Sequence, residues 1–297
     1  MSVSDQCCSN PPTLTPDCGA GEVQELGGLT CYVSGSADSK IAVILISDIF
    51  GYEAPKLRFN IFYFQKPPRV GGGFFGVKGK KDDKVQKNIQ AQNRSEKTDM
   101  ANFNHVNIRI DRFVLKLADK VAAAGYYTVV PDYFRGDPCD AERFHQVFPG
   151  WIKIHGPEQG FEDTKPLIEA LKSKGITKIG AAGFCWGAKV VVELAKEGYI
   201  QAGVLLHPSL INVEDIQGVK VPLSILGAEH DQSSPPELVK QFETILNAKP
   251  EVDSFVKIFP GVSHGWAVRC SDDDEHAVKS AEEAHGDMLD WFAKYLK

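Results

Sequence analysis

The sequence of 297 residues has no apolar run near the roughly 18 residues that a membrane-spanning helix needs. It also has no excess of basic charge, because its net charge is −6 at pH 7. Nucleic acid and membrane are therefore not expected partners. The first residues lack the basic flank and apolar core of a secretory signal, and we expect a cytoplasmic protein.

Cysteine is present but lacks the spacing of a disulfide framework. Seven cysteines, an odd number, are spread over a long chain, which favours reduced thiols. Three of them, Cys7, Cys8 and Cys18, lie close together, but no histidine is near and three sulfurs do not complete a zinc site. We expect no metal and no cofactor.

Apolar runs alternate with helical patterns along most of the chain. The run 41–47 is continuously apolar and rich in branched residues, as in a strand buried on both faces of a parallel sheet. The alternation predicts an α/β fold with a doubly wound, mostly parallel sheet and helices on both faces. The predicted strands are 22–26, 29–33, 41–47, 126–130, 177–182, 202–206, 221–226 and 254–259, and the predicted helices 162–174, 186–197, 236–246 and 279–296.

We expect an irregular arm at 1–20, one domain over 21–297 and a long connection at 139–160. Segment 59–115 departs from this pattern. It carries eleven Lys and Arg against five Asp and Glu, with little periodicity. Such a long unpatterned stretch is uncommon inside a compact domain. Joining 55–58 to 116–125 would give one helix with an apolar face formed by Leu57, Leu117, Ala118, Val121 and Ala122.

Segment 59–115 therefore reads as an insertion, expected to be disordered, that interrupts a complete helix. Two explanations stay open for it. The segment is either a translated intron or gene-model error, or a genuine lid or partner-binding insertion. Sequencing of the mature transcript separates them.

The stretch Gly183-Phe184-Cys185-Trp186-Gly187 joins a predicted strand to a predicted helix. Strand, Gly-x-nucleophile-x-Gly and helix form the nucleophile-elbow pattern, here with cysteine as the nucleophile. The positive end of the helix dipole would favour the thiolate. A structural cysteine in an ordinary turn is the alternative interpretation of this stretch alone.

Two further residues complete a candidate triad. Asp231 follows the strand 221–226, and His264 follows the strand 254–259. Acid before histidine is the chain order of hydrolases with a nucleophile elbow. Because all three residues come after the carboxyl ends of strands, we expect them to meet at one edge of the sheet. The predicted catalytic residues are thus Cys185, Asp231 and His264.

These stretches, with 227–231, 261–265 and Asp48-Ile49-Phe50-Gly51, resemble the signatures of the dienelactone hydrolase family in the α/β-hydrolase superfamily. The similarity is to a carboxymethylenebutenolidase-like, plant-type member and covers 20–58 and 116–297, with nothing matching 59–115. The resemblance implies Cys185 as nucleophile, His264 as base and Asp231 as its orienting acid.

The resemblance also implies an oxyanion hole made by the backbone N–H groups of Ile49 and Trp186. It places Asp48 where family members carry a Glu that contacts the thiol, and Arg269 near an arginine that holds a substrate carboxylate. Both are candidate substrate-binding residues. The shorter Asp48 reaches less far than Glu, and a salt bridge to the acidic run 272–275 is the alternative for Arg269.

The expected function is hydrolysis of a small ester or (enol-)lactone through a cysteine thioester, by a monomer or weak homodimer with a small-molecule substrate. Two alternatives stay open. Some plant relatives are labelled endo-1,3;1,4-β-glucanases, and a chain that keeps the elbow without turnover would be a binding or redox-sensing module.

Overall fold

The computed structural model describes residues 21–51, 112–271 and 273–297, without the side chains of 112–116. The predicted arm at 1–20, residues 55–58 and most of segment 59–115 lie outside these ranges, so their predicted structure stays a prediction.

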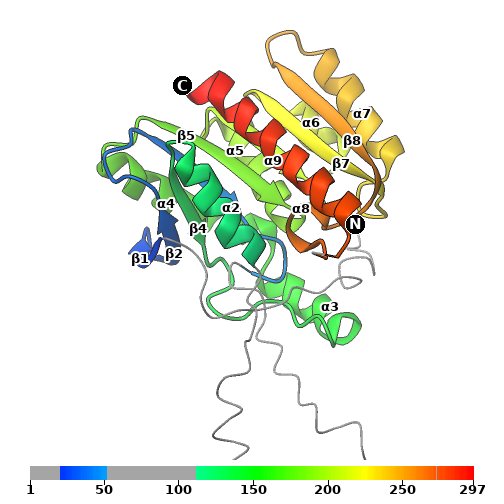
Figure 1. Cartoon of the computed structure of the whole chain (residues 1–297), viewed down its shortest axis with the longest axis horizontal. Helices are drawn as coiled ribbons and strands as arrows, with labels where there is room; N and C mark the ends of the chain where they lie inside the picture. The colour runs from blue at the N-terminus through cyan, green and yellow to red at the C-terminus, as the bar shows by residue number, and fades with distance from the viewer. Residues whose placement is uncertain (1–20, 52–111, 272) are drawn as a thin grey trace, which may run out of the picture. The chain divides into compact units, whose positions relative to one another are not determined.

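The described strands form one eight-stranded sheet in the order β1-β2-β4-β3-β5-β6-β7-β8 (Figure 1). Pairing is antiparallel between β1 and β2 and between β2 and β4, and parallel for every other pair. The mostly parallel sheet confirms the predicted architecture. The strands are β1 (Glu22–Leu26), β2 (Leu29–Ser34), β3 (Ile41–Ile46), β4 (Tyr127–Pro131), β5 (Lys178–Phe184), β6 (Ala202–Leu206), β7 (Leu223–His230) and β8 (Ser254–Ser263).

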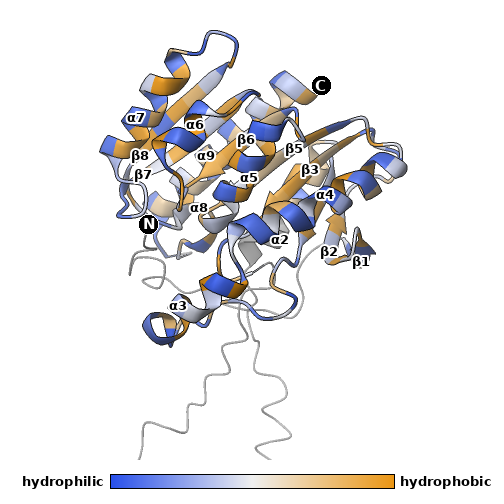
Figure 2. Cartoon of the chain, turned by 180° about the vertical axis from the view of Figure 1, so that it is seen from behind, coloured by the Kyte–Doolittle hydropathy of each residue, from blue (hydrophilic) through white to orange (hydrophobic). Residues whose placement is uncertain are grey.

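Helices cover both faces of this sheet and give it two hydrophobic cores. One core contains buried residues of α2, α8 and α9, and the other those of α3 to α7. Figure 1 shows α9 crossing one face, and Figure 2 shows α5 on the opposite face. The helices are α2 (Arg112–Ala123), α3 (Phe144–Ile154), α4 (Pro157–Ser173), α5 (Trp186–Glu197), α6 (Val213–Gln217), α7 (Pro236–Asn247), α8 (Trp266–Arg269) and α9 (Glu275–Leu296).

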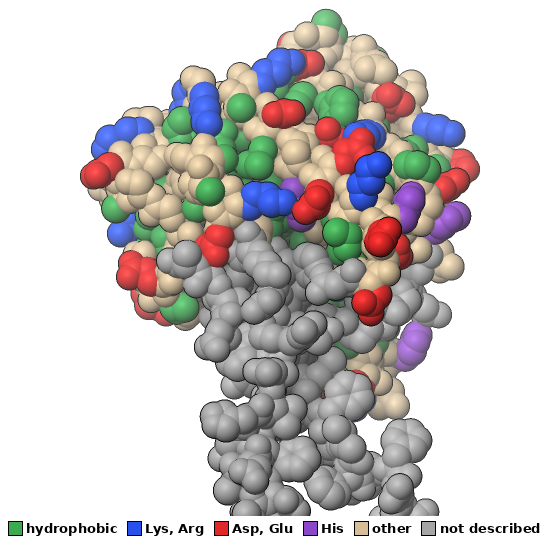
Figure 3. All heavy atoms as spheres, in the orientation of Figure 1, with side chains coloured by type: hydrophobic (Ala, Val, Ile, Leu, Met, Phe, Trp, Pro, Cys, Tyr) green, Lys and Arg blue, Asp and Glu red, His purple; other side chains and the backbone are tan. Residues whose placement is uncertain are grey.

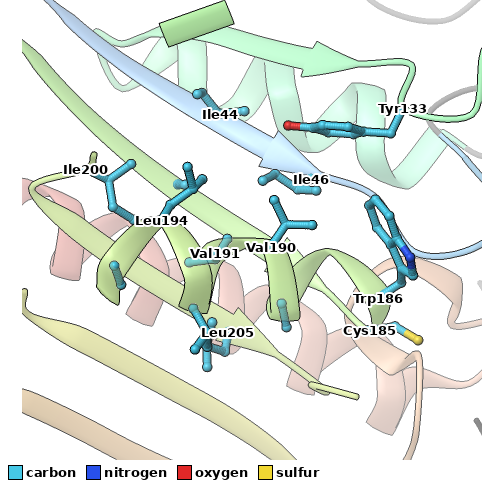
Figure 4. Packing of buried hydrophobic residues seen from close by; sticks show 14 of the residues in the cluster. Ile44, Ile46, Tyr133, Cys185, Trp186, Val190, Val191, Leu194, Ile200 and Leu205 are labelled. Carbon is cyan, nitrogen blue, oxygen red and sulfur yellow. The ribbon is translucent and has the colours of Figure 1, made fainter. Parts of the chain in front are cut away.

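The sequence of β3 is continuously apolar because both faces of this strand are buried. Ile44 and Ile46 belong to the core under α5, whereas Val43 and Leu45 belong to the core under α9. All four side chains are fully buried. Figure 4 shows Ile44 and Ile46 packed beside the helix that carries Val190. Because both faces of the strand are covered, neither set of alternate positions tolerates a polar side chain.

The surface that Figure 3 shows carries acidic and basic side chains intermixed over the described residues. Large hydrophobic side chains exposed within the described part are Val23, Ile154 and Phe255. None of the described helices is long and apolar enough to cross a membrane.

The predicted long connection at 139–160 is wrong, because the structure has α3 and the start of α4 there. Pro149 lies inside α3 and Pro157 is the first residue of α4. Proline at a first helical position costs little, since its missing N–H has no acceptor there. Within α3, burial of Phe144 and Trp151 offsets the poor helix propensity of Pro149-Gly150. The short helices α6 and α8 were not predicted, because four or five residues show no periodicity.

The predicted apolar face of the interrupted helix is largely confirmed in α2. Leu117, Ala118 and Val121 are buried in the core that contains α9. The helix begins at Arg112, whereas the predicted insertion ends at 115, and the bounds of that insertion stay a prediction. The described helix therefore includes residues 112–115 of the segment predicted as an insertion.

The two glycines of the elbow are required by close backbone contacts. A Cβ on Gly183 would lie 2.3 Å from the carbonyl oxygen of Gly187, and one on Gly187 would lie 2.2 Å from that of Ile46. Both distances are far shorter than any real Cβ contact. Strands β3 and β5 are therefore held close to the first turn of α5 only because both positions lack a side chain.

Replacement Gly187→Ala should lower the free energy of unfolding by about 2–3 kcal/mol, because rigid backbone must move to admit the methyl group. Urea unfolding measures the effect. Gly286→Ala, in α9 with nothing within 4 Å of its Cβ position, is the matched control. It should raise stability by about 0.5–1 kcal/mol. Equal losses in both variants would contradict the steric argument.

Candidate active site

Cys185 lies between β5 and α5 as the N-cap residue, with φ 52° and ψ −108°. A non-glycine residue with this φ is strained, and three backbone hydrogen bonds hold it. Its N–H donates to Leu206 O at 3.2 Å, and its C=O accepts from Ala188 N at 3.2 Å and Ser209 N at 3.1 Å. Figure 4 shows its sulfur beside Trp186, at the beginning of α5. The side chain is fully buried.

Asp231 and His264 directly follow β7 and β8, and the structure brings them together. Asp231 Oδ2 lies 2.7 Å from His264 Nδ1, with both side chains fully buried. The other carboxylate oxygen, Oδ1, accepts the N–H groups of Ser233 at 2.7 Å and Ser234 at 3.1 Å. The acid is thus fixed by its own loop. Since Nδ1 is bound to Asp231, Nε2 is the ring nitrogen left for the thiol.

The electrostatics of His264 depend on these neighbours. Burial lowers the pKa of His264, but the adjacent Cys185 and Asp231 outweigh burial and raise it to about 9. Cys185 is thus close enough to favour the imidazolium. Because folding raises this pKa above 6.5, the charged group stabilises the fold fully below about pH 6.5. That contribution is lost as the pH rises through about 9.

Asp48 and Arg269 form a buried ion pair at the same edge of the sheet. Arg269 Nε lies 2.8 Å from Asp48 Oδ2, with 2% and 6% of the two side chains exposed. Asp48 Oδ1 accepts the N–H of Phe50 at 2.9 Å, and the guanidinium lies over the Phe50 ring. Gly265 leaves room for this arginine, because a Cβ there would lie 2.4 Å from the guanidinium.

Burial raises the pKa of Asp48 above its ordinary value, although Arg269 acts to lower it, and Cys185 adds to the increase. Asp48 is therefore close enough to the thiol to be affected by its charge, while its carboxylate is engaged by Arg269. Arg269 therefore pairs with Asp48, the other candidate substrate-binding residue. Whether either residue binds substrate stays a prediction.

Ile49 and Trp186 come to this edge from neighbouring strands, since Ile46 of β3 pairs with Gly183 of β5. The C=O of Ile49 accepts the N–H of Cys139 at 2.9 Å, which fixes the loop. Trp186 is the first residue of α5, where backbone N–H groups have no intrahelical acceptor. Its indole N–H donates to His155 O at 2.9 Å. The two backbone N–H groups stay the predicted oxyanion hole.

Two residues at the site were missed from the sequence, and both follow β6. Ser209 Oγ lies 3.3 Å from Cys185 Sγ. His207 is fully buried with φ 37°, and its ring centroid lies 5.0 Å from that of His264. Burial holds the pKa of His207 well below its ordinary value. Their place after the carboxyl end of a parallel strand is the signal that could have found them.

The described residues contain no group of three or more His, Cys, Asp or Glu arranged to hold a metal ion. The expected absence of metal and cofactor stays a prediction for the whole chain. The polar side chains that meet at the described site are a thiol, two imidazoles, a hydroxyl, a guanidinium and two carboxylates.

A model of the dienelactone hydrolase family matches residues 106–296. The chain belongs to this family, and it is a hydrolase. The match begins before residue 116, so the expectation that nothing in 59–115 resembles the family is wrong for 106–115. The segment 59–105 lies before this match, and its origin stays a prediction.

Relatives in the family carry two kinds of name. The chain is 34% identical over 253 residues to a maize protein named endo-1,3;1,4-beta-D-glucanase, covering 83% of this chain and 63% of the maize protein. It is 32% identical over 184 residues to the human carboxymethylenebutenolidase homolog, covering 61% of this chain and 75% of the human protein.

Solved structures share the fold of this hydrolase. A putative dienelactone hydrolase from Klebsiella pneumoniae superposes with a TM-score of 0.59 at 17% identity, over 96% of this chain and 98% of that one. A dienelactone hydrolase from Anabaena variabilis superposes with a TM-score of 0.52 at 12% identity, over 93% and 97%. At such identities the likeness shows the fold alone, and it confirms the predicted α/β-hydrolase fold.

Replacement Asp231→Asn should lower the pKa of His264 by more than about 1, because the charged hydrogen-bond acceptor is lost while burial remains. The ring proton shifts of His264 in an NMR titration measure this pKa. Asp253→Asn removes an exposed carboxylate that pairs with Lys294 and is the control. An unchanged pKa in Asp231→Asn would contradict the assigned coupling.

Replacement Arg269→Met should destabilise the fold by about 3–5 kcal/mol, because it leaves the buried Asp48 without its ion-pair partner. The double variant with Asp48→Asn should recover part of the loss. Urea unfolding of both variants tests the coupling. Lys294→Met, from an exposed ion pair, should change stability little. Additive losses in the double variant would show that the pair is not coupled.

Proposed function

We propose that this hydrolase cleaves small carboxylic esters or lactones through a thioester on Cys185. The observation that carries the proposal is the His264–Asp231 contact of 2.7 Å beside a buried, strained cysteine at a helix N-terminus. A nucleophile, a base and a group that orients the base are the parts that acyl transfer needs.

The proposed reaction has two stages. His264 takes the proton of Cys185, and the thiolate attacks the carbonyl carbon of the ester. The N–H groups of Ile49 and Trp186 stabilise the oxyanion, and the imidazolium returns its proton to the leaving alkoxide or enolate. In the second stage His264 takes a proton from water, which attacks the thioester and releases the acid and the thiolate.

Sulfur narrows the substrate class. A thiolate forms more easily than an alkoxide, but it also leaves more readily from the tetrahedral intermediate. Amides, whose leaving groups are poor, would therefore revert to the bound substrate. Activated esters and enol-lactones, whose oxygen leaving groups are good, fit this site better.

The name of the maize relative makes a β-glucan substrate the second candidate. A glycosidase needs two carboxyl groups, one of them available as an acid. Here Asp231 is bound by His264 and two backbone N–H groups, and Asp48 is paired with Arg269. Both carboxylates are therefore engaged by other groups. Glycoside hydrolysis by two carboxyl groups would also not require the thiol of Cys185. This arrangement favours the ester or lactone reaction.

Replacement Cys185→Ala should lower kcat/KM for p-nitrophenyl acetate by at least about 10³-fold, because it removes the thiol that forms the proposed acyl intermediate. Cys31→Ala is the matched control, since Cys31 is equally buried in β2. Burial raises the pKa of Cys31 to about 12, so its thiol stays neutral and unreactive.

Activity that survives Cys185→Ala would refute the cysteine mechanism. A β-glucan assay of the same variant separates the second candidate, because glycosidase activity would not need the thiol. A chain whose Cys185 is alkylated readily but which hydrolyses no ester would fit the binding or redox-sensing module instead.

A further inference from the structure

The hydroxyl of Ser209 contacts the sulfur of Cys185, the proposed nucleophile. Ser209 Oγ is 3.3 Å from Cys185 Sγ, and the serine is fully buried. Within the described residues, this sulfur is the one hydrogen-bond partner that the hydroxyl has. The hydroxyl is therefore placed to share a hydrogen bond with the sulfur.

The backbone holds the two residues in this arrangement. Ser209 N donates to Cys185 O at 3.1 Å, and Cys185 N donates to Leu206 O at 3.2 Å. The end of β6 and the loop after it are therefore both hydrogen-bonded to the backbone of Cys185. Ser209 is positioned by the same contacts that hold the strained φ of Cys185.

The chemistry of sulfur decides which way the hydrogen bond runs during catalysis. A thiol is a weak donor and a weak acceptor, whereas a thiolate is a charged acceptor and forms much stronger hydrogen bonds. A hydroxyl that donates to the sulfur therefore favours the thiolate over the thiol. If the thiol donated to Ser209 instead, the serine would favour the neutral form.

We propose that Ser209 is a further catalytic residue, whose hydroxyl donates a hydrogen bond to the Cys185 thiolate. The inference rests on the proposed function and adds to it a second group, besides His264, that supports the charge on sulfur. The serine acts when the thiolate is formed and again when it is released.

The hydrogen bond from Ser209 has its largest effect in the second stage, when the C–S bond of the thioester breaks. Water adds to the thioester carbonyl while His264 takes one of its protons, which gives a tetrahedral oxyanion. The oxyanion reforms the carbonyl, the C–S bond breaks, and the sulfur leaves with the electron pair as thiolate. The Ser209 hydroxyl stabilises that leaving thiolate, while the neutral thioester sulfur before it is a poor acceptor.

The test is the pKa of the Cys185 thiol in the full chain, measured by the pH dependence of iodoacetamide alkylation. Mass spectrometry of the tryptic peptide 179–189 reports this thiol separately from the other cysteines. Ser209→Ala should raise the thiol pKa by about 1, so that about tenfold less thiolate is present at a pH well below it.

Ser224→Ala is the matched control. Ser224 is equally buried in β7, but its hydroxyl has no hydrogen-bond partner within the described residues. Its loss should leave the pKa of Cys185 unchanged. Ser209→Thr keeps the hydroxyl and should stay close to the wild-type value, and Ser209→Gly deletes the hydroxyl should the alanine variant fail to fold.

An unchanged or lowered thiol pKa in Ser209→Ala, or in Ser209→Gly, would overturn the inference. Alkylation needs no turnover, so this result is independent of whether the chain hydrolyses esters. Conversely, activity that survives Cys185→Ala would refute the proposed function without altering the measured thiol pKa. The two failures are therefore distinguishable.

Discussion

The candidate active site depends on the close approach of β3, β5 and the first turn of α5, which only glycine permits. Gly183 and Gly187 place backbone atoms where a Cβ would lie little more than 2 Å from a carbonyl oxygen. This approach forces the chain between them into a sharp turn and gives Cys185 its positive φ. The strain is offset by hydrogen bonds to the end of β6 and to the loop after it. Loosening any of these contacts would move the sulfur.

The charges around the sulfur are arranged in two buried pairs. His264 is bound to Asp231, and Arg269 is bound to Asp48. Each pair would be costly to bury if one member were missing, so the pairs stabilise the site only as complete units. Cys185 acts on both pairs, because its charge raises the pKa of His264 and the pKa of Asp48. Protonation of the thiol is therefore coupled to both pairs.

The loop after β6 contributes two further side chains, His207 and Ser209, to the surroundings of His264 and Cys185. His207 presents a neutral imidazole to the ring of His264, and Ser209 presents a hydroxyl to the sulfur. Leu206 at the end of β6 accepts the N–H of Cys185, and Ser209 N in the loop donates to its C=O. The backbone geometry of Cys185 and the hydrogen bond to its sulfur are therefore set by one segment of the chain.

The sequence by itself determined the sheet, the elbow and the order of Cys185, Asp231 and His264, because each depends on local pattern: apolar runs, a Gly-x-Cys-x-Gly turn and residues just past strand ends. It failed at 139–160, where buried aromatic side chains override a proline and a glycine inside a helix. Only the tertiary structure decided that Arg269 pairs with Asp48 and that Ser209 contacts the sulfur. Such contacts join loops far apart in the chain. Position after a strand end places these residues at one edge of the sheet, but it does not say which of their side chains make contact.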